Sequence, residues 1–262
     1  MHRFSVFVTL TTLLLVIAGA LVTSNDAGGA IPDWPLSWGK VIPPLEGGVV
    51  YAYTHRVLAA VVIVLTFILG LKTRTWLPFG LVVAQALVGG LTVLLVLPKA
   101  TVLVHACLAQ LCFGVLVWQA TGVPFPRHFA GHGPAPLLAV VGLFAQTILG
   151  AAVRHHLVSA TPHILGAIVV AVIVLWAVVP AMLEHMLQAG ALLALTAFQI
   201  FLGMGAYFAR TLDTPQPLPA MVAFTAAHVA VGSMAFGAAI VLALVLYWRQ
   251  HSESGMGGMA VA

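Results

Sequence analysis

The sequence predicts an all-α integral membrane protein whose eight transmembrane helices form two pseudo-symmetric four-helix bundles. Hydrophobic residues make up 62% of the chain and charged residues only 6%, with a mean hydropathy of +1.12, whereas about a quarter of a soluble domain is charged. Apolar runs of about 20 residues, enough to cross a hydrocarbon core of roughly 30 Å, recur along the chain. The alternating segments of about 10 residues that are typical of barrel strands do not occur. We therefore expect the chain to lie in a lipid bilayer.

The apolar runs define the expected helices and their topology. They are Phe4–Thr23, Val49–Leu71, Leu77–Leu97, Thr101–Ala120, Pro136–Val153, Ala160–Val179, Met186–Ala209 and Pro219–Trp248. The first run is longer than the core of a signal peptide, about 7–15 residues, so it is expected to span the membrane rather than to be cleaved. An even number of spans places both termini on one side. A bacterial plasma membrane is the expected location.

Basic residues leave the orientation nearly balanced. Five lie on each side of the membrane among the 10 Lys and Arg residues, so the positive-inside rule alone does not choose. If Arg56 and Arg154 are held by a ligand and are not counted as free loop charge, the rule favours cytoplasmic termini. The net charge of +4 requires no nucleic-acid partner.

Repeated motifs divide the chain into two halves. Residues 1–121 are expected to form the first half, 122–134 a connecting loop, 135–248 the second half and 249–262 a polar C-terminal tail. The stretch Gln146–Gly150 is echoed by Gln199–Gly203 and by the residues that follow Gln85. Parallel repeats of this kind place equivalent sites at equivalent depths.

Four histidines recur at comparable positions in the even-numbered spans. His55, His105 and His163 lie roughly 5–10 Å along their helices at 1.5 Å per residue, and His228 lies somewhat further along its helix. An ionisable residue at membrane depth marks a functional site by default. Paired histidines on facing helices of a bundle suit axial ligation of a porphyrin iron. The alternative, a single histidine that forms a hydrogen bond across helices, explains four matched positions less economically.

Arginines, cysteines and further histidines also occur along the chain, and each allows a functional or a structural interpretation. Arg56 and Arg154 would pair with haem propionates, or would extend toward lipid headgroups. Cys107 and Cys112 are interpreted as small core residues. Closely spaced zinc ligands are absent from the sequence. The remaining histidines are interpreted as solvated or structural: His155, His156, His2, His128, His132, His185 and His251.

Several motifs together resemble the haem A synthase family along nearly the whole chain. They are Pro32–Leu36, Thr54–Arg56, Gly89–Val93 followed by Leu97 and Pro98, His105, Leu149–His155, His163 and His228. The resemblance implies that His163 and His228 hold a b-type haem, while His55 and His105 line the site for haem O. The implied reaction oxidises a porphyrin methyl to a formyl group and yields haem A for terminal oxidases. Haem O synthase and terminal oxidase assembly proteins are the implied partners.

The chain departs from this family in two places. The family has a glutamate three residues before the histidine of helix two, where this chain has Ala52, so the catalytic residue is unknown. Glu46 is a speculative substitute. Many members carry a cysteine pair around the first outer loop, and those positions are Ile31 and Ser37 here. A thiol-linked redox role for that loop is therefore excluded.

Two functions consequently remain open. The chain is either a haem A synthase-like oxidoreductase or a non-catalytic membrane haem-binding protein, such as an electron carrier or a haem-handling assembly factor. A small transporter with a proton relay of histidines is a weaker alternative, because no pair of glycine- or proline-broken spans stands out.

Overall fold

The computed structural model describes residues 2–95, 99–124, 133–212 and 217–257, and these are almost entirely helical. The helices are α1 (His2–Ser24), α2 (Gly48–Thr73), α3 (Leu77–Leu94), α4 (Lys99–Thr121), α5 (Ala135–Arg154), α6 (Ala160–Ala181), α7 (Met186–Thr211) and α8 (Pro219–Gly257), with a short 3-10 turn at Ala27–Gly29. Within the described ranges, eight helices are long and apolar enough to cross a membrane. The predicted fold class is confirmed.

The helix ends lie within two residues of the expected ones except in two places. Helix α3 ends at Leu94 rather than Leu97, and residues 96–98 lie outside the described part of the chain. Helix α8 continues to Gly257, so the expected polar tail begins within a helix. The sequence from Arg249 to Ser254 contains neither glycine nor proline, the two residues that most strongly oppose helix formation. The middle of the expected connecting loop, 125–132, also falls outside the described residues.

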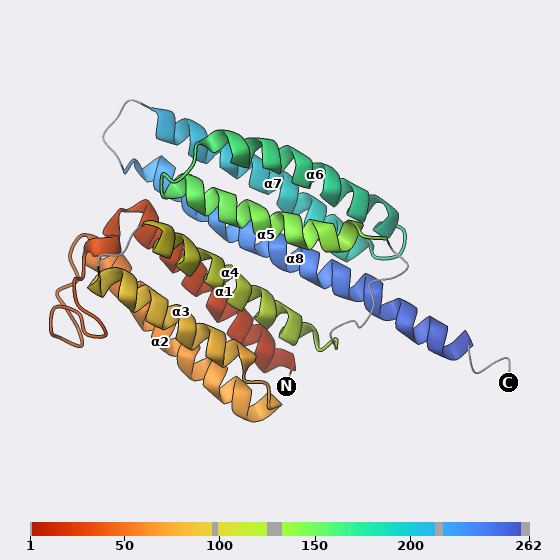
Figure 1. The fold of residues 1–262 in the computed structure, drawn as a ribbon, viewed down its shortest axis with the longest axis horizontal. Helices are drawn as coiled ribbons and strands as arrows, with labels where there is room; N and C mark the ends of the chain where they lie inside the picture. The colour runs from red at the N-terminus through yellow and green to blue at the C-terminus, as the bar shows by residue number, and fades with distance from the viewer. Residues whose placement is uncertain (1, 96–98, 125–132, 213–216, 258–262) are drawn as a thin grey trace.

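The helices form two closed groups that run along a common direction (Figure 1). In the first group, α1 and α3 each pack against both α2 and α4; in the second, α5 and α7 each pack against both α6 and α8. The two groups meet where α8 contacts α1 and α4, and where α4 contacts α5. Both chain ends lie at the same end of the molecule (Figure 1).

Reciprocal contacts between α4 and α8 indicate a pseudo-twofold axis between the groups. A Cβ atom added to Gly114 of α4 would lie 2.9 Å from the Phe236 ring of α8, and one added to Gly237 of α8 would lie 3.4 Å from the Phe113 ring of α4. Such mutual contacts, in which each surface uses the same residues, are the mark of a twofold interface. The axis therefore passes between α4 and α8.

A polar contact lies on the same interface. Gln110 Nε2 donates a hydrogen bond of 2.9 Å to Ser233 Oγ, and both residues are buried. Gln110 follows His105 by five residues, and Ser233 follows His228 by five. Equivalent positions of the two halves thus meet at the axis, as the sequence repeat predicts.

Helix α8 lies at the centre of the molecule. In the most apolar 18-residue stretch of α8, 61% of the residues are buried, whereas the corresponding share in each of the other described helices is 33% or less. Helix α6 shows the opposite pattern, since large hydrophobic side chains including Leu165, Ile168, Val172 and Val179 are exposed along it. These exposed side chains form the expected lipid-facing surface.

The α4–α8 contact can be tested by overpacking it. We expect Gly114→Val to destabilise the protein by about 1–3 kcal/mol, because the new methyl groups would collide with Phe236. Gly190→Val is the matched control, since a Cβ at Gly190 would meet nothing within 4 Å. Thermal unfolding in detergent would compare the two variants, and equal melting temperatures would contradict the close packing.

Candidate functional site

Each of the four candidate histidines packs its imidazole against a glycine of the preceding helix. The pairs are His55 with Gly19, His105 with Gly89, His163 with Gly150, and His228 with Gly203. A Cβ atom added to any of these glycines would lie only 2.8–3.2 Å from the imidazole Cε1. Small residues allow close approach of membrane helices, and here they leave room for a ring between two backbones.

The structure brings His163 and His228 together between α6 and α8. Their ring centroids are 6.1 Å apart and their planes are nearly perpendicular, at 88°. Two imidazoles that each place a nitrogen roughly 2 Å from one metal ion have ring centres about 6 Å apart. The separation of the two rings therefore fits a single metal centre between them.

The hydrogen bonds of His228 leave Nε2 as the nitrogen that can bind a metal. Its Nδ1 lies 3.0 Å from the backbone oxygen of Gln199, and a carbonyl oxygen can only accept. Nδ1 therefore carries the hydrogen, and the Nε2 lone pair accepts from Gln199 Nε2 at 3.2 Å. Histidines that bind metals usually donate their other ring hydrogen to a carbonyl or carboxylate. Among the described residues, Nδ1 of His163 has no hydrogen-bond partner.

The N-terminal pair is built on the same plan with fewer polar neighbours. His55 of α2 packs against Gly19 of α1, and His105 of α4 packs against Gly89 of α3. Gln85 Nε2 donates to the backbone oxygen of His105 at 2.7 Å. In α3, α5 and α7, a glutamine lies four residues before the glycine that contacts the histidine. In α1 the corresponding residue is Leu15, four residues before Gly19. The spacing of a glutamine four residues before a glycine is visible in the sequence. The contacts of these glutamines with the histidine-bearing helices are visible only in the structure.

Arg56 binds the first outer loop. Its guanidinium donates to the backbone oxygens of Leu36 at 2.7 Å, Asp33 at 2.8 Å and Ile31 at 3.2 Å, and lies 3.4 Å from Ser37 Oγ. The sequence predicted a haem propionate as the partner of this arginine. That role stays a prediction, and the structure adds a second one, which is to hold the loop beside the N-terminal histidine pair.

The Asp33 carboxylate also stabilises this loop through hydrogen bonds. This carboxylate accepts hydrogen bonds from the backbone N–H groups of Trp38 at 2.6 Å and Gly39 at 2.7 Å. Both donors have positive φ angles, 56° for Trp38 and 66° for Gly39, so the chain turns tightly around the carboxylate. The hydrogen bond from Gly39 is the main reason that the pKa of Asp33 lies below its ordinary value of 3.8.

Trp34 anchors the loop on Gly90 of α3. A Cβ atom added to Gly90 would lie 2.6 Å from the indole ring of Trp34, and the preceding Gly89 receives His105. Two adjacent glycines thus accept two different rings. The loop therefore places an aromatic side chain on the same stretch of α3 that receives His105, a contact between distant parts of the chain that the sequence alone does not reveal.

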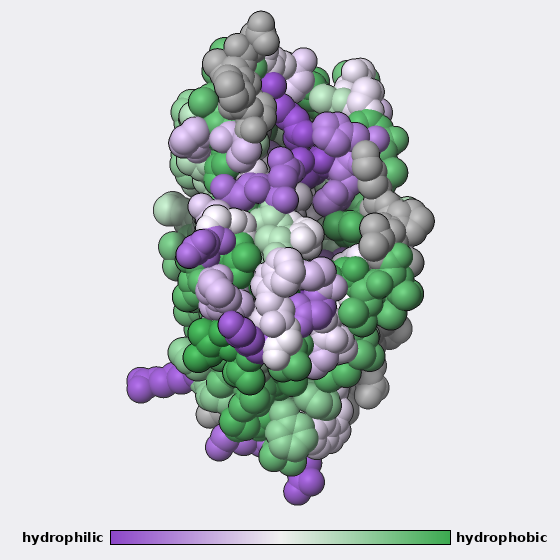
Figure 2. Space-filling model, turned by 90° about the vertical axis from the view of Figure 1, so that its left-hand side faces the viewer, coloured by the Kyte–Doolittle hydropathy of each residue, from purple (hydrophilic) through white to green (hydrophobic). Residues whose placement is uncertain are grey.

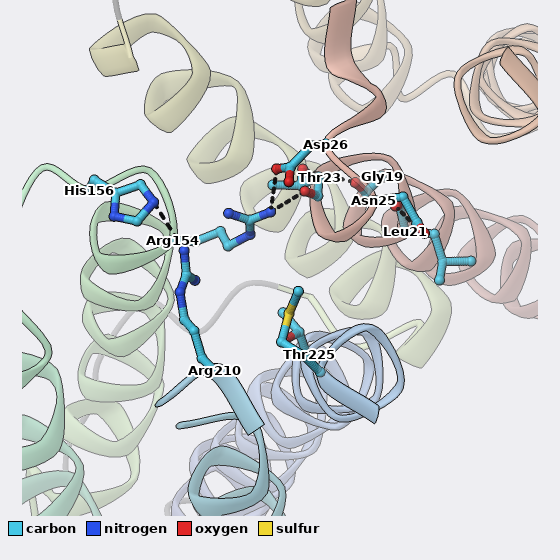
Figure 3. A network of polar contacts seen from close by, with 10 residues as sticks. Gly19, Leu21, Thr23, Asn25, Asp26, Arg154, His156, Arg210 and Thr225 are labelled. Carbon is cyan, nitrogen blue, oxygen red and sulfur yellow. Dashed lines mark hydrogen bonds and ion pairs between the residues drawn. The ribbon is translucent and has the colours of Figure 1, made fainter. Parts of the chain in front are cut away.

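The C-terminal ends of α5 and α7 carry a second polar cluster (Figure 3). Arg154 donates to the backbone oxygen of Thr23 and pairs with Asp26 Oδ1 at 3.1 Å. Arg210, which the sequence did not single out, lies with Nη2 3.0 Å from His156 Nε2. Figure 3 shows the two guanidinium groups next to each other. Hydrophilic residues gather on this end of the molecule, bordered by the apolar sides of the helices (Figure 2).

The position of the family glutamate contains no acid. Ala52 is buried, with 7% of its surface exposed. Glu46 is exposed and precedes the start of α2 at Gly48, so its carboxylate is not carried by the helix that bears His55. Among the described residues, the position of the family glutamate therefore holds a methyl group and no carboxylate.

The loop around Asp33 gives a pH-dependent prediction. Because folding lowers the pKa of Asp33, its contribution to loop stability is present above the unfolded pKa and is lost as the pH falls through the folded pKa. We expect the Asp33 carboxyl to titrate below 3.8 by NMR. In Asp33→Asn, at least one of the Trp38 and Gly39 amides should exchange hydrogen faster at neutral pH, because the new side chain keeps one accepting oxygen and its NH2 group cannot accept. Asp26→Asn is the control, and equal exchange in the two variants would contradict the assignment.

Comparison with known proteins identifies relatives over about half of the chain. A protein named heme A synthase from Symbiobacterium thermophilum is 33% identical over 173 residues, 56% of each chain. One of the same name from Exiguobacterium sibiricum is 28% identical over 177 residues, 58% of each chain. A third, from Chelativorans sp., is 29% identical over 150 residues, 48% of this chain and 42% of the relative.

These matches define how far the relationship extends. The chain spans about half the length of the relatives that it matches. No family model matches it. The apolar helices and the bacterial relatives indicate a multi-pass bacterial membrane protein. The relatives support the resemblance that the motifs indicate, and over about half of its length the chain is similar to proteins named heme A synthase.

Proposed function

We propose that this protein is a haem A synthase-like membrane oxidoreductase that converts haem O to haem A. In this proposal His163 and His228 hold haem b, and His55 and His105 bind haem O as the substrate. The observation that carries the proposal is the pair of perpendicular imidazoles of His163 and His228, 6.1 Å apart. The names of the relatives support the choice of reaction.

In the C-terminal half, the residues would hold and orient the cofactor. His228 offers the Nε2 lone pair, and His163 faces it from α6. Haem bound between two histidines supplies one-electron transfer. Arg154 and Arg210 lie at the outer ends of α5 and α7, on the same side as the histidines. Guanidinium groups bind carboxylates strongly, so these two arginines would bind the propionates.

In the N-terminal half, the residues would position the substrate. His55 and His105 lie against Gly19 and Gly89, and in this proposal the porphyrin would bind between their two rings. Trp34 lies on Gly90 and would shield this region from water. Arg56 would act indirectly, because its hydrogen bonds hold the loop that carries Trp34.

A non-catalytic haem-binding protein is the second candidate function. The buried Ala52 favours it, because a methyl side chain can neither accept nor donate a proton. If the family glutamate handles protons during methyl oxidation, this chain would keep the histidines and lose turnover. The two candidates therefore share the haem sites and differ in the reaction.

Pigment analysis separates the two candidates. We expect co-expression of this protein with a source of haem O to produce extractable haem A, because substrate and protein would then share one membrane. A strain that lacks this protein is the control. Haem b bound to the protein together with unchanged haem O would rule out the oxidase and leave the second candidate.

Single substitutions test the cofactor site. We expect His163→Ala and His228→Ala each to abolish the low-spin absorption spectrum of bound haem b, because one axial ligand would be missing. His156→Ala is the control, since His156 is exposed and contacts Arg210. A low-spin spectrum that is unaltered in both ligand variants would refute the assignment.

A further inference from the structure

Gln199 of α7 contacts both ring nitrogens of His228. Its backbone oxygen lies 3.0 Å from Nδ1, and its side-chain nitrogen lies 3.2 Å from Nε2. The side chain reaches this position because Gly232 of α8 leaves room, since a Cβ atom there would lie 2.7 Å from the Gln199 amide nitrogen. One residue therefore holds the imidazole from two sides.

The charge of the ring supports this assignment of the amide. If the Gln199 amide were turned to place its oxygen at Nε2, both ring nitrogens would have to carry hydrogens. The imidazole would then be a cation within the membrane, without a carboxylate in contact among the described residues. Uncompensated charge in an apolar interior is costly. The neutral ring, with hydrogen on Nδ1 and the amide donating to Nε2, is the consistent arrangement.

The glutamines at the equivalent positions of α5 and α3 make different contacts. Gln146 of α5 directs its amide nitrogen toward Gly166 of α6, and Gln85 of α3 donates to the backbone oxygen of His105. All three occupy the position four residues before the glycine that receives a histidine. Within the described residues, Gln199 is the one whose amide covers a histidine nitrogen. The contact is therefore specific to His228 and is not a general result of the repeat.

We propose that Gln199 is a positioning residue that presets His228 as a metal ligand and covers its Nε2 lone pair until haem binds. The inference rests on the proposed haem site of His163 and His228. One lone pair can serve either the amide hydrogen or a metal, so the bond from Gln199 Nε2 breaks on ligation. The bond from Nδ1–H to the Gln199 carbonyl remains and fixes the ring. His228 is the preset ligand, and His163, whose Nδ1 has no partner among the described residues, is the adjustable one.

The hydrogen bond from Gln199 Nε2 to His228 Nε2 is expected to lower the affinity for haem b. Haem binding must break this bond, so removing the Gln199 amide should favour the haem-bound state. A net hydrogen bond of ordinary strength corresponds to about a two- to tenfold change in a dissociation constant. We expect Gln199→Leu to bind haem b about two- to tenfold more tightly than the parent protein. Gln146→Leu is the matched control, because it removes the same side chain at the same repeat position without uncovering a histidine nitrogen.

A second readout uses the protein without haem. In histidine-labelled apoprotein, nitrogen NMR should show His228 with hydrogen on Nδ1 and a hydrogen-bonded Nε2. Gln199→Leu should shift the Nε2 signal toward that of a free lone pair, and Gln146→Leu should leave it in place. If Gln199→Leu does not fold, Gln199→Ala provides the same two measurements.

The outcomes separate this inference from the proposed function. An unchanged Nε2 signal in Gln199→Leu, or haem affinity equal to or weaker than that of the parent protein, would overturn the role of Gln199. A parent protein that binds no haem would overturn the proposed function, while the nitrogen signals would still decide whether Gln199 covers His228. A shifted signal together with tighter haem binding supports the proposal.

Discussion

The close approach of an imidazole to a glycine backbone is the constraint on which the candidate sites depend. At each of the four positions, an added Cβ atom would lie within 3.2 Å of the ring, so any other residue would displace the ring or separate the helices. Nδ1 of His163 has no hydrogen-bond partner among the described residues, while the rings of His55 and His105 lie near the backbone of Leu15 and Gln85, four residues before their glycines. Close packing against a glycine is therefore the feature that all four rings share.

The two halves share this packing plan and differ in the polar groups around it. In the N-terminal half, Arg56 and Asp33 hold a loop that places Trp34 on Gly90 of α3. In the C-terminal half, Arg154 joins the end of α5 to Asp26 at the end of α1, and Gln199 contacts the ring of His228. A common backbone arrangement with different polar surroundings suits two haem sites with different roles.

The sequence predicted the helices and the histidine positions because both depend on local properties, namely apolar length and rise per residue. It did not predict the partners of Arg56, which lie 19–25 residues earlier in the chain. Consecutive residues of a helix do not face the same direction, so an arginine next to His55 need not share its site. The glutamine repeat was visible, but which atom of which ring Gln199 would contact depended on the packing of α7 against α8.

The central position of α8 has a consequence for how the protein is made. Helix α8 packs against α1, α4, α5 and α7, yet it is the last of these helices to leave the ribosome. Until it inserts, Gly114 lacks Phe236, Gln110 lacks Ser233, and His163 lacks His228. Until α8 inserts, the surfaces of α1, α4, α5 and α7 that contact it lack their partner, and its insertion completes both this packing and the pair of His163 and His228.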